Sequence, residues 1–165
     1  MDYTALASTD SVTKTADALR LHNFEPIVVT SKKEALAKII ELIPAGASVM
    51  NGASRTLEEV GYIEYLKSGT HGWNNLHEAI VTETDPAKQA VLRKQSVISD
   101  FYLGSVHALT ETGELLIASN TGSQLPHLVY TSPNIILVVS TKKIVPTLSD
   151  AFSRIEEHVV PLEDV

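Results

Sequence analysis

The residue best suited to chemistry in this chain is Glu111, which stands at the rim of a tight turn over Thr112 and Gly113. A carboxylate in such a place can be a general base, a nucleophile or a solvated loop charge, and the residue types alone leave all three open. The turn lies within residues 96–121, which predict two strands folded back on each other. Glu114 follows the turn, and as a cross-strand neighbour it would repel Glu111 and favour protonation of one carboxyl group. The alternative is that both carboxylates are solvated.

A second candidate lies in residues 51–56, NGASRT, where a strand is predicted to give way to a helix. Backbone N–H groups at such a junction point above the sheet edge, where an anion is the natural ligand. Gly52 permits close approach, Ser54 and Thr56 offer hydroxyls, and Arg55 offers a charge-assisted bond to phosphate or carboxylate. The alternative interpretation is that Ser54 only caps the helix and Arg55 is solvated.

Two further polar stretches bear on a ligand site. The turn around Gly122, NTGSQ, is expected to face residues 51–56 across the strand ends, where open α/β sheets bind ligands. Residues 68–85 lack periodicity and predict a long loop, which would act either as a lid with Trp73 as a stacking surface or as an ordinary surface loop.

The histidines do not form a metal-binding pattern. His71 and His77 lie in the predicted loop, and neither they nor His107 and His127 form an HxH or HExxH motif. We therefore expect no metal, and the sequence identifies no cofactor. His107 shares a strand face with Glu111, but a rise of about 3.3 Å per residue separates them by roughly 13 Å. They therefore cannot form a direct pair.

The composition excludes several classes of protein. The chain has 165 residues, 44% of them hydrophobic, and a mean hydropathy near zero, so one sizeable core is expected and two are not. We therefore predict a single domain over residues 1–165. The net charge is −7, and the lack of a basic cluster with interleaved aromatic residues makes nucleic acid an unexpected partner.

Cysteine content and hydropathy limit the chemistry and the location further. The chain has no cysteine, which excludes disulfides, iron–sulfur ligation by this chain and a thiol nucleophile. The N-terminus MDYTALASTD has no basic or apolar leader region, and no run approaches about 18 apolar residues. Neither export nor membrane association is therefore predicted, and we expect a cytoplasmic protein.

The predicted elements alternate between helices and short strands. Such alternation favours an α/β domain with helices on both sides of a mostly parallel sheet, to which the turn over Thr112 and Gly113 adds an antiparallel pair. The apolar residues of the fragment LEEVGYIEYLK spread round its helix axis, which suggests cover on more than one side and self-association. Helices are expected at 9–22, 31–43, 57–67, 85–95 and 147–159, and strands at 26–29, 47–50 and 135–140.

The chain resembles the lactate-utilisation (LUD) domain family, also called the YkgG or LutC-like group. The resemblance rests on four fragments that occur in order within residues 31–160: NGASRTLEEVG, SDFYLGSVHALTETGELL, NTGSQLPHLVY and ILVVSTKKIV. It implies a three-layer α/β/α, Rossmann-like fold of the NagB/RpiA/CoA-transferase-like superfamily. It also implies an association with bacterial lactate oxidation by iron–sulfur proteins, whose clusters would have to belong to partners because this chain has no cysteine.

The resemblance also assigns site residues. Gly52, Ser54 and Thr56 match the family's glycine and hydroxyl turn, and Glu111 with Gly113 matches its Glu-x-Gly turn. CoA transferases of the wider superfamily use a glutamate in a Glu-Asn-Gly turn as an acyl-accepting nucleophile. In this chain Thr112 replaces the asparagine, Arg55 stands where a small or apolar residue is expected, and Ser123-Gln124 replaces an Asn-Arg pair.

These matches leave two hypotheses. In the first, a small anionic metabolite of acyl, CoA or sugar-phosphate type is held by residues 52–56 and meets Glu111 as base or nucleophile. In the second, the protein is a non-catalytic accessory or regulatory subunit of lactate oxidation.

Overall fold

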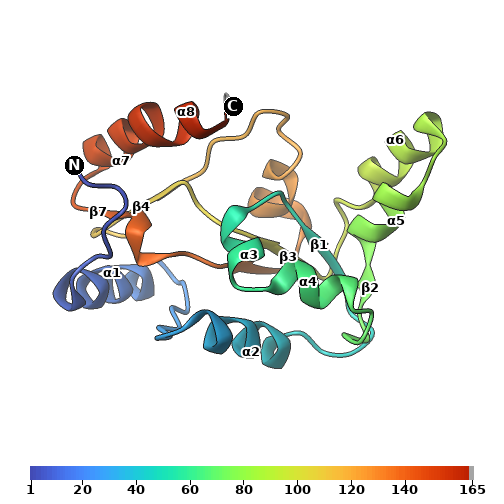
Figure 1. The fold of residues 1–165 in the computed structure, drawn as a ribbon, viewed down its shortest axis with the longest axis horizontal. Coiled ribbons are helices and arrows are strands. Elements are labelled where there is room, and N and C mark those ends of the chain that lie inside the picture. Colours follow the sequence, from blue (N-terminus) through green and yellow to red (C-terminus); the bar gives the residue numbers. More distant parts are fainter. Residues whose placement is uncertain (164–165) are drawn as a thin grey trace. The chain divides into compact units, whose positions relative to one another are not determined.

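The computed structural model describes residues 1–163 (Figure 1). The chain divides into two compact units, each assembled from separate segments. Unit 1 comprises Met1–Val29, Ser105–Ala118 and Val139–Val165, and unit 2 comprises Thr30–Gly104 and Ser119–Val138. The last two residues of the predicted domain lie outside the described residues.

Unit 2 is built on a four-stranded parallel sheet. Its strands are β1 (Ser48–Asn51), β2 (Asn74–Asn75), β3 (Phe101–Gly104) and β6 (Asn134–Leu137), in the spatial order β2-β1-β3-β6. From β1 the chain passes first to β2 on one side and then to β3 on the other. The order therefore reverses between β1 and β3, and their carboxyl ends form a topological switch point.

One face of this sheet carries the main apolar core. It is covered by α2 (Lys32–Leu42), α3 (Arg55–Glu59) and α4 (Tyr62–Lys67). Gly61 separates α3 from α4 with a φ of +83°, a backbone conformation that favours glycine. This break lets both short helices face the core, which accounts for the apolar spread seen in the sequence. The buried residues are Ile39, Ile43, Val49, Leu57, Val60, Tyr62, Leu66, Trp73 and Leu103.

The opposite face is covered near the centre of β3. Successive strand residues point to opposite faces, so Tyr102 points away from the core that contains Leu103. Its ring stacks on His127, with the ring centroids 4.4 Å apart and the planes 16° from parallel. His127 begins η1 (His127–Thr131), a single turn of π-helix. Helical structure therefore lies on both sides of a mostly parallel sheet, consistent with the three-layer α/β/α fold.

The prediction of a long loop at residues 68–85 is wrong. Strand β2 and α5 (Leu76–Thr82) occupy half of this range, and Asn75 caps α5 by accepting a hydrogen bond from the Glu78 N–H. Trp73 is buried, and its Nε1 donates to the Ile43 carbonyl at 3.2 Å. Trp73 is thus part of the core and is no exposed stacking surface. The following helix, α6 (Pro86–Gln95), is capped by Asp85, where the predicted helix begins.

Two predicted strands also differ from the structure. The apolar run from Pro26 is not a strand, and Ile27 and Val28 are exposed. Strand β6 forms, but it pairs with β3 on one side only in the described sheet, and Ile135 remains 40% exposed. Both runs are continuously apolar, a pattern that is typical of strands buried on both faces. Such a pattern reports strand propensity but not how many neighbours the strand will find.

Among the described residues, unit 1 contains a smaller sheet and three helical segments. Strand β4 (Ala108–Thr110) pairs antiparallel with β5 (Leu115–Leu116) and parallel with β7 (Ile144–Val145). The predicted pair around Gly113 is therefore confirmed but short, since β3 belongs to unit 2. Helix α1 (Thr9–Leu21) is capped by Ser8. A short 3-10 helix, η2 (Thr141–Lys143), precedes β7, and α7 (Leu148–Arg154) continues through η3 (Ile155–Val159) into α8 (Val160–Glu163).

Residues far apart in sequence form the core of unit 1. Ala108, Leu116, Val145 and Ala151 are buried together, and Ile155 packs against them. Helix α7 begins with a capping box between Thr147 and Asp150, where the predicted helix begins. Among residues 1–163, no helix has both the length and the apolar character needed to cross a membrane.

Candidate functional site

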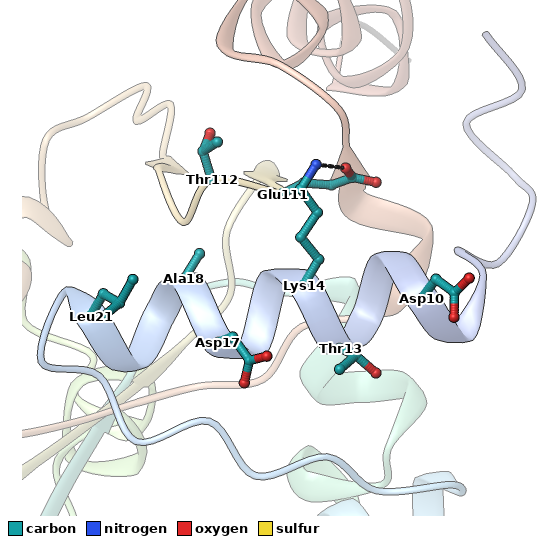
Figure 2. A pocket seen from close by; sticks show the side chains of 8 residues that line it. All are labelled: Asp10, Thr13, Lys14, Asp17, Ala18, Leu21, Glu111 and Thr112. Carbon is teal, nitrogen blue, oxygen red and sulfur yellow. Dashed lines mark hydrogen bonds and ion pairs between the residues drawn. The ribbon is translucent and has the colours of Figure 1, made fainter.

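Glu111 lies in unit 1, where it ties α1 to the β4–β5 turn. Its Oε1 accepts a hydrogen bond from Ser11 Oγ at 2.6 Å, and its Oε2 pairs with Lys14 Nζ at 2.8 Å. Figure 2 shows Lys14 rising from α1 to the carboxylate, while Thr13 and Asp17 point away from it. The carboxylate lines a groove along α1 together with Asp10, Thr13, Lys14, Asp17, Ala18, Leu21 and Thr112.

The two carboxylates beside the turn have separate hydrogen-bond donors. Hydrogen bonds from Lys14 and Ser11 lower the pKa of Glu111. Glu114 instead accepts hydrogen bonds from the hydroxyls of Thr110 and Thr112, which lower its pKa as well. The alternative in which one carboxyl group is protonated is therefore wrong. It failed because each carboxylate has its own donors, which neighbouring sequence positions do not reveal.

Gly113 is required by packing as well as by the turn. Its φ is +93°, and an added Cβ would lie 3.0 Å from His22 Nδ1 and 3.2 Å from the Ala18 carbonyl carbon. Helix α1 therefore rests directly on the turn that carries Glu111. In this arrangement Glu111 is ionised and both of its oxygens have donors, which lowers its basicity and its nucleophilicity.

Replacing Glu111 by glutamine is expected to weaken the attachment of α1 by about 1 kcal/mol at pH 7, because the amide cannot form the ion pair with Lys14. The stabilisation by Glu111 is complete above its ordinary pKa of 4.5 and is lost as the pH falls through the lower pKa of the folded protein. Hydrogen exchange of the α1 amides, followed by mass spectrometry, measures the effect. Glu64→Gln is the control, because its pair with Lys67 is exposed. Unchanged α1 exchange in Glu111→Gln would contradict the structural role.

In unit 2, Gly52 follows β1 directly and so lies at the switch point between β1 and β3. The space that a side chain would fill there is already occupied. A Cβ at Gly52 would lie 2.5 Å from the Tyr102 hydroxyl oxygen and 3.4 Å from Gln124 Oε1. Gly52 thus permits the predicted close approach, but the group that approaches its backbone is the Tyr102 side chain.

The turn around Gly122 does lie beside Gly52, as predicted. Gly122 has a φ of +72°, and its N–H donates to Ser119 Oγ at 3.0 Å. Gln124, two residues later, provides the contact with Gly52. The end of β1 and the Gly122 turn are therefore neighbours within unit 2, although they are seventy positions apart in the sequence.

The remaining residues of the 51–56 segment have mixed environments. Ser54 caps α3 and accepts a hydrogen bond from the Leu57 N–H, which matches the alternative interpretation for this residue. Arg55 is exposed, whereas Thr56 is buried. Helix α3 has only five residues, so its dipole is too short to hold an anion unaided. An anion at this edge would depend on side chains.

A buried polar cluster in unit 2 was missed by sequence reasoning. His127 Nδ1 lies 2.8 Å from Ser132 Oγ and 3.4 Å from Ser99 Oγ, and the two serine oxygens are 3.0 Å apart. All three residues are buried, and burial lowers the pKa of His127. The cluster joins η1 to the segments that precede β3 and β6. No spacing rule relates these residues, so only their burial could have identified them.

The other histidines have structural surroundings. His71 stacks on Trp73 with centroids 5.3 Å apart, and His107 Nδ1 accepts a hydrogen bond from the Ala118 N–H. Burial lowers the pKa of His77. Within residues 1–163, no three His, Cys, Asp or Glu side chains gather in a way that could hold a metal ion.

The predicted site residues are thus divided between the two units. Glu111 and Gly113 lie in unit 1, and Gly52, Ser54, Arg55, Thr56 and Gly122 lie in unit 2. That they serve one ligand stays a prediction.

Comparison with known proteins identifies one family. The model of the LUD domain matches residues 12–163, which is nearly the whole chain. No curated protein and no solved structure matches the chain significantly.

Proposed function

Because the chain belongs to the LUD domain family, which supports an association with lactate utilisation, we propose that it binds a small anionic metabolite at the carboxyl ends of β1 and β3. The observation that carries the proposal is the position of Gly52. It lies at the switch point of a parallel sheet, with the Gly122 turn beside it. Ligands of open α/β sheets bind at such points.

Several groups of unit 2 can serve this ligand. Arg55 is exposed at the start of α3 and supplies a positive charge, while Gly122 shapes the neighbouring turn. Ser54 is engaged as a cap, so it contributes through the backbone of the turn more than through its hydroxyl. A guanidinium group binds carboxylate or phosphate through paired hydrogen bonds. The ligand class is therefore a small carboxylate or phosphate ester.

The contacts of Glu111 favour a binding role over acyl transfer. An acyl-accepting carboxylate must present a free oxygen to its substrate, and both oxygens of Glu111 have donors from α1. A CoA-transferase-like or sugar-phosphate reaction at Glu111 would need Ser11 and Lys14 to release it. The second candidate is therefore a non-catalytic accessory or regulatory subunit, which would bind the ligand as a signal and act on iron–sulfur partner proteins.

Thermal-shift measurements with lactate, a CoA thioester, a sugar phosphate and a folate test the proposal. At least one should stabilise the protein, by about 2.7 kcal/mol at a ligand concentration one hundred times the dissociation constant. Arg55→Gln is expected to reduce the response because it removes the cation at the strand ends. Arg93→Gln, which removes an exposed cation from α6, is the matched control and should respond normally.

The same samples separate the two roles. The binding proposal predicts no covalent adduct on Glu111 after incubation with the CoA thioester, as measured by mass spectrometry. An acyl adduct on Glu111 would establish the transferase alternative instead. Stabilisation by none of the ligands would overturn the proposed site.

A further inference from the structure

The Tyr102 hydroxyl is a buried donor without an acceptor. Tyr102 is 2% exposed, and its hydroxyl has no hydrogen-bond partner among the described residues. The adjacent Gly52 N–H donates to the Leu103 carbonyl at 3.2 Å. An unsatisfied buried hydroxyl costs about 1–3 kcal/mol. A phenylalanine would fill the same space and stack equally well on His127, so packing alone does not explain why a tyrosine stands here.

The unpaired hydroxyl lies at the switch point itself. A Cβ at Gly52 would meet the hydroxyl oxygen at 2.5 Å, and a Cβ at Gly104 would meet the ring at 3.0 Å. The two glycines thus leave room for the Tyr102 ring across the carboxyl ends of β1 and β3. Gln124, from the Gly122 turn, is the next nearest group to the same position.

We propose that the Tyr102 hydroxyl recognises the ligand, donating a hydrogen bond to a carboxylate or phosphate oxygen. This inference rests on the proposed function and adds a residue that selects the ligand. Access requires the Gln124 side chain to move away from Gly52. Burial raises the pKa of Tyr102 to about 12, so the phenol keeps its proton at neutral pH and remains a donor.

Tyr62 provides a matched control within the same unit. It is also fully buried, and its hydroxyl also lacks a partner among the described residues. However, Tyr62 belongs to the apolar core on the other face of the sheet, where it packs with Leu57 and Trp73. The two tyrosines therefore differ in position and not in burial.

The test compares Tyr102→Phe and Tyr62→Phe with the wild-type protein. Affinity for L-lactate, inorganic phosphate and a sugar phosphate is measured by calorimetry, so that carboxylate and phosphate sources are distinguished. Tyr102→Phe should lose about tenfold in affinity, the loss that corresponds to one hydrogen bond of about 1.4 kcal/mol. Tyr62→Phe should bind as the wild type does. Without ligand, the thermal midpoint of Tyr102→Phe should be equal to or above that of the wild type.

Each contrary outcome has a distinct meaning. If the wild-type protein binds a probe and Tyr102→Phe binds it with the same affinity, this inference is overturned and the proposed function stands. A lower midpoint of ligand-free Tyr102→Phe overturns it too, because the hydroxyl would then have a structural partner. Absence of wild-type binding to all three probes overturns the proposed function, and the inference with it.

Discussion

Gly52→Ala is expected to lower the free energy of unfolding of unit 2 by about 2 kcal/mol. Overpacking of a filled interior typically costs 1–3 kcal/mol, and the new methyl group would lie 2.5 Å from the Tyr102 hydroxyl oxygen. Gly52 is not among the glycines with positive φ, so an alanine there introduces no backbone strain. The cost comes from one contact between two side chains.

A double-mutant cycle isolates that contact. In a Tyr102→Phe background the hydroxyl is gone, and the nearest remaining groups are Gln124 Oε1 at 3.4 Å and the ring carbon Cζ at 3.7 Å. Gly52→Ala should then cost much less. Urea unfolding followed by the fluorescence of Trp73, the only tryptophan, reports on the core of unit 2. An equal loss in both backgrounds would show that Tyr102 does not set the size limit at Gly52.

His127→Ala is expected to lower the free energy of unfolding by about 3 kcal/mol, more than Gly52→Ala does. The substitution removes a buried ring that stacks on Tyr102 and leaves a cavity, and large-to-small changes of aromatic side chains in cores cost roughly 3–5 kcal/mol. It also removes the hydrogen-bond partner of Ser132, although Ser99 can still pair with that hydroxyl. Trp73 fluorescence in urea measures the change. His77→Ala, at a partly exposed position, is the control and should cost far less.

His127 is also expected to make the stability of the protein depend on pH. Because burial depresses the pKa of His127 below its ordinary value of 6.5, the unfolded chain takes up a proton before the folded protein does. The stabilisation is therefore complete above pH 6.5 and is lost as the pH falls from 6.5 to the folded pKa. His127→Ala should show a flatter profile than wild type between pH 7 and pH 5. A profile of unchanged slope would indicate that His127 is not the group that titrates.

Much of the fold was predictable because its signals are local. The caps Ser8, Ser31, Asp85 and Thr147 begin helices where the sequence places them, since a cap bonds to N–H groups only a few positions away. The antiparallel pair around Gly113 has the same origin. The predicted loop at 68–85 failed because the short elements β2 and α5 leave too few residues to show a period.

The candidate site was predictable only in part. Residue types identified Glu111 and Gly52 as positions of interest, but they could not say what each one meets. The carboxylate meets Ser11 and Lys14, which lie 100 and 97 positions away in the sequence. These contacts convert a supposed reactive group into a link between α1 and the β4–β5 turn.

The sequence by itself determined the family, the α/β class and the glycine turns at Gly52, Gly113 and Gly122, because each depends on local composition and order. Only the tertiary structure decided what fills the space beside those turns. Glu111 is held by α1, and Gly52 is small because the hydroxyl of Tyr102 lies against it. Hydrogen bonding and close packing act over a few ångströms in space, irrespective of distance along the chain, so they become visible only when the chain is folded.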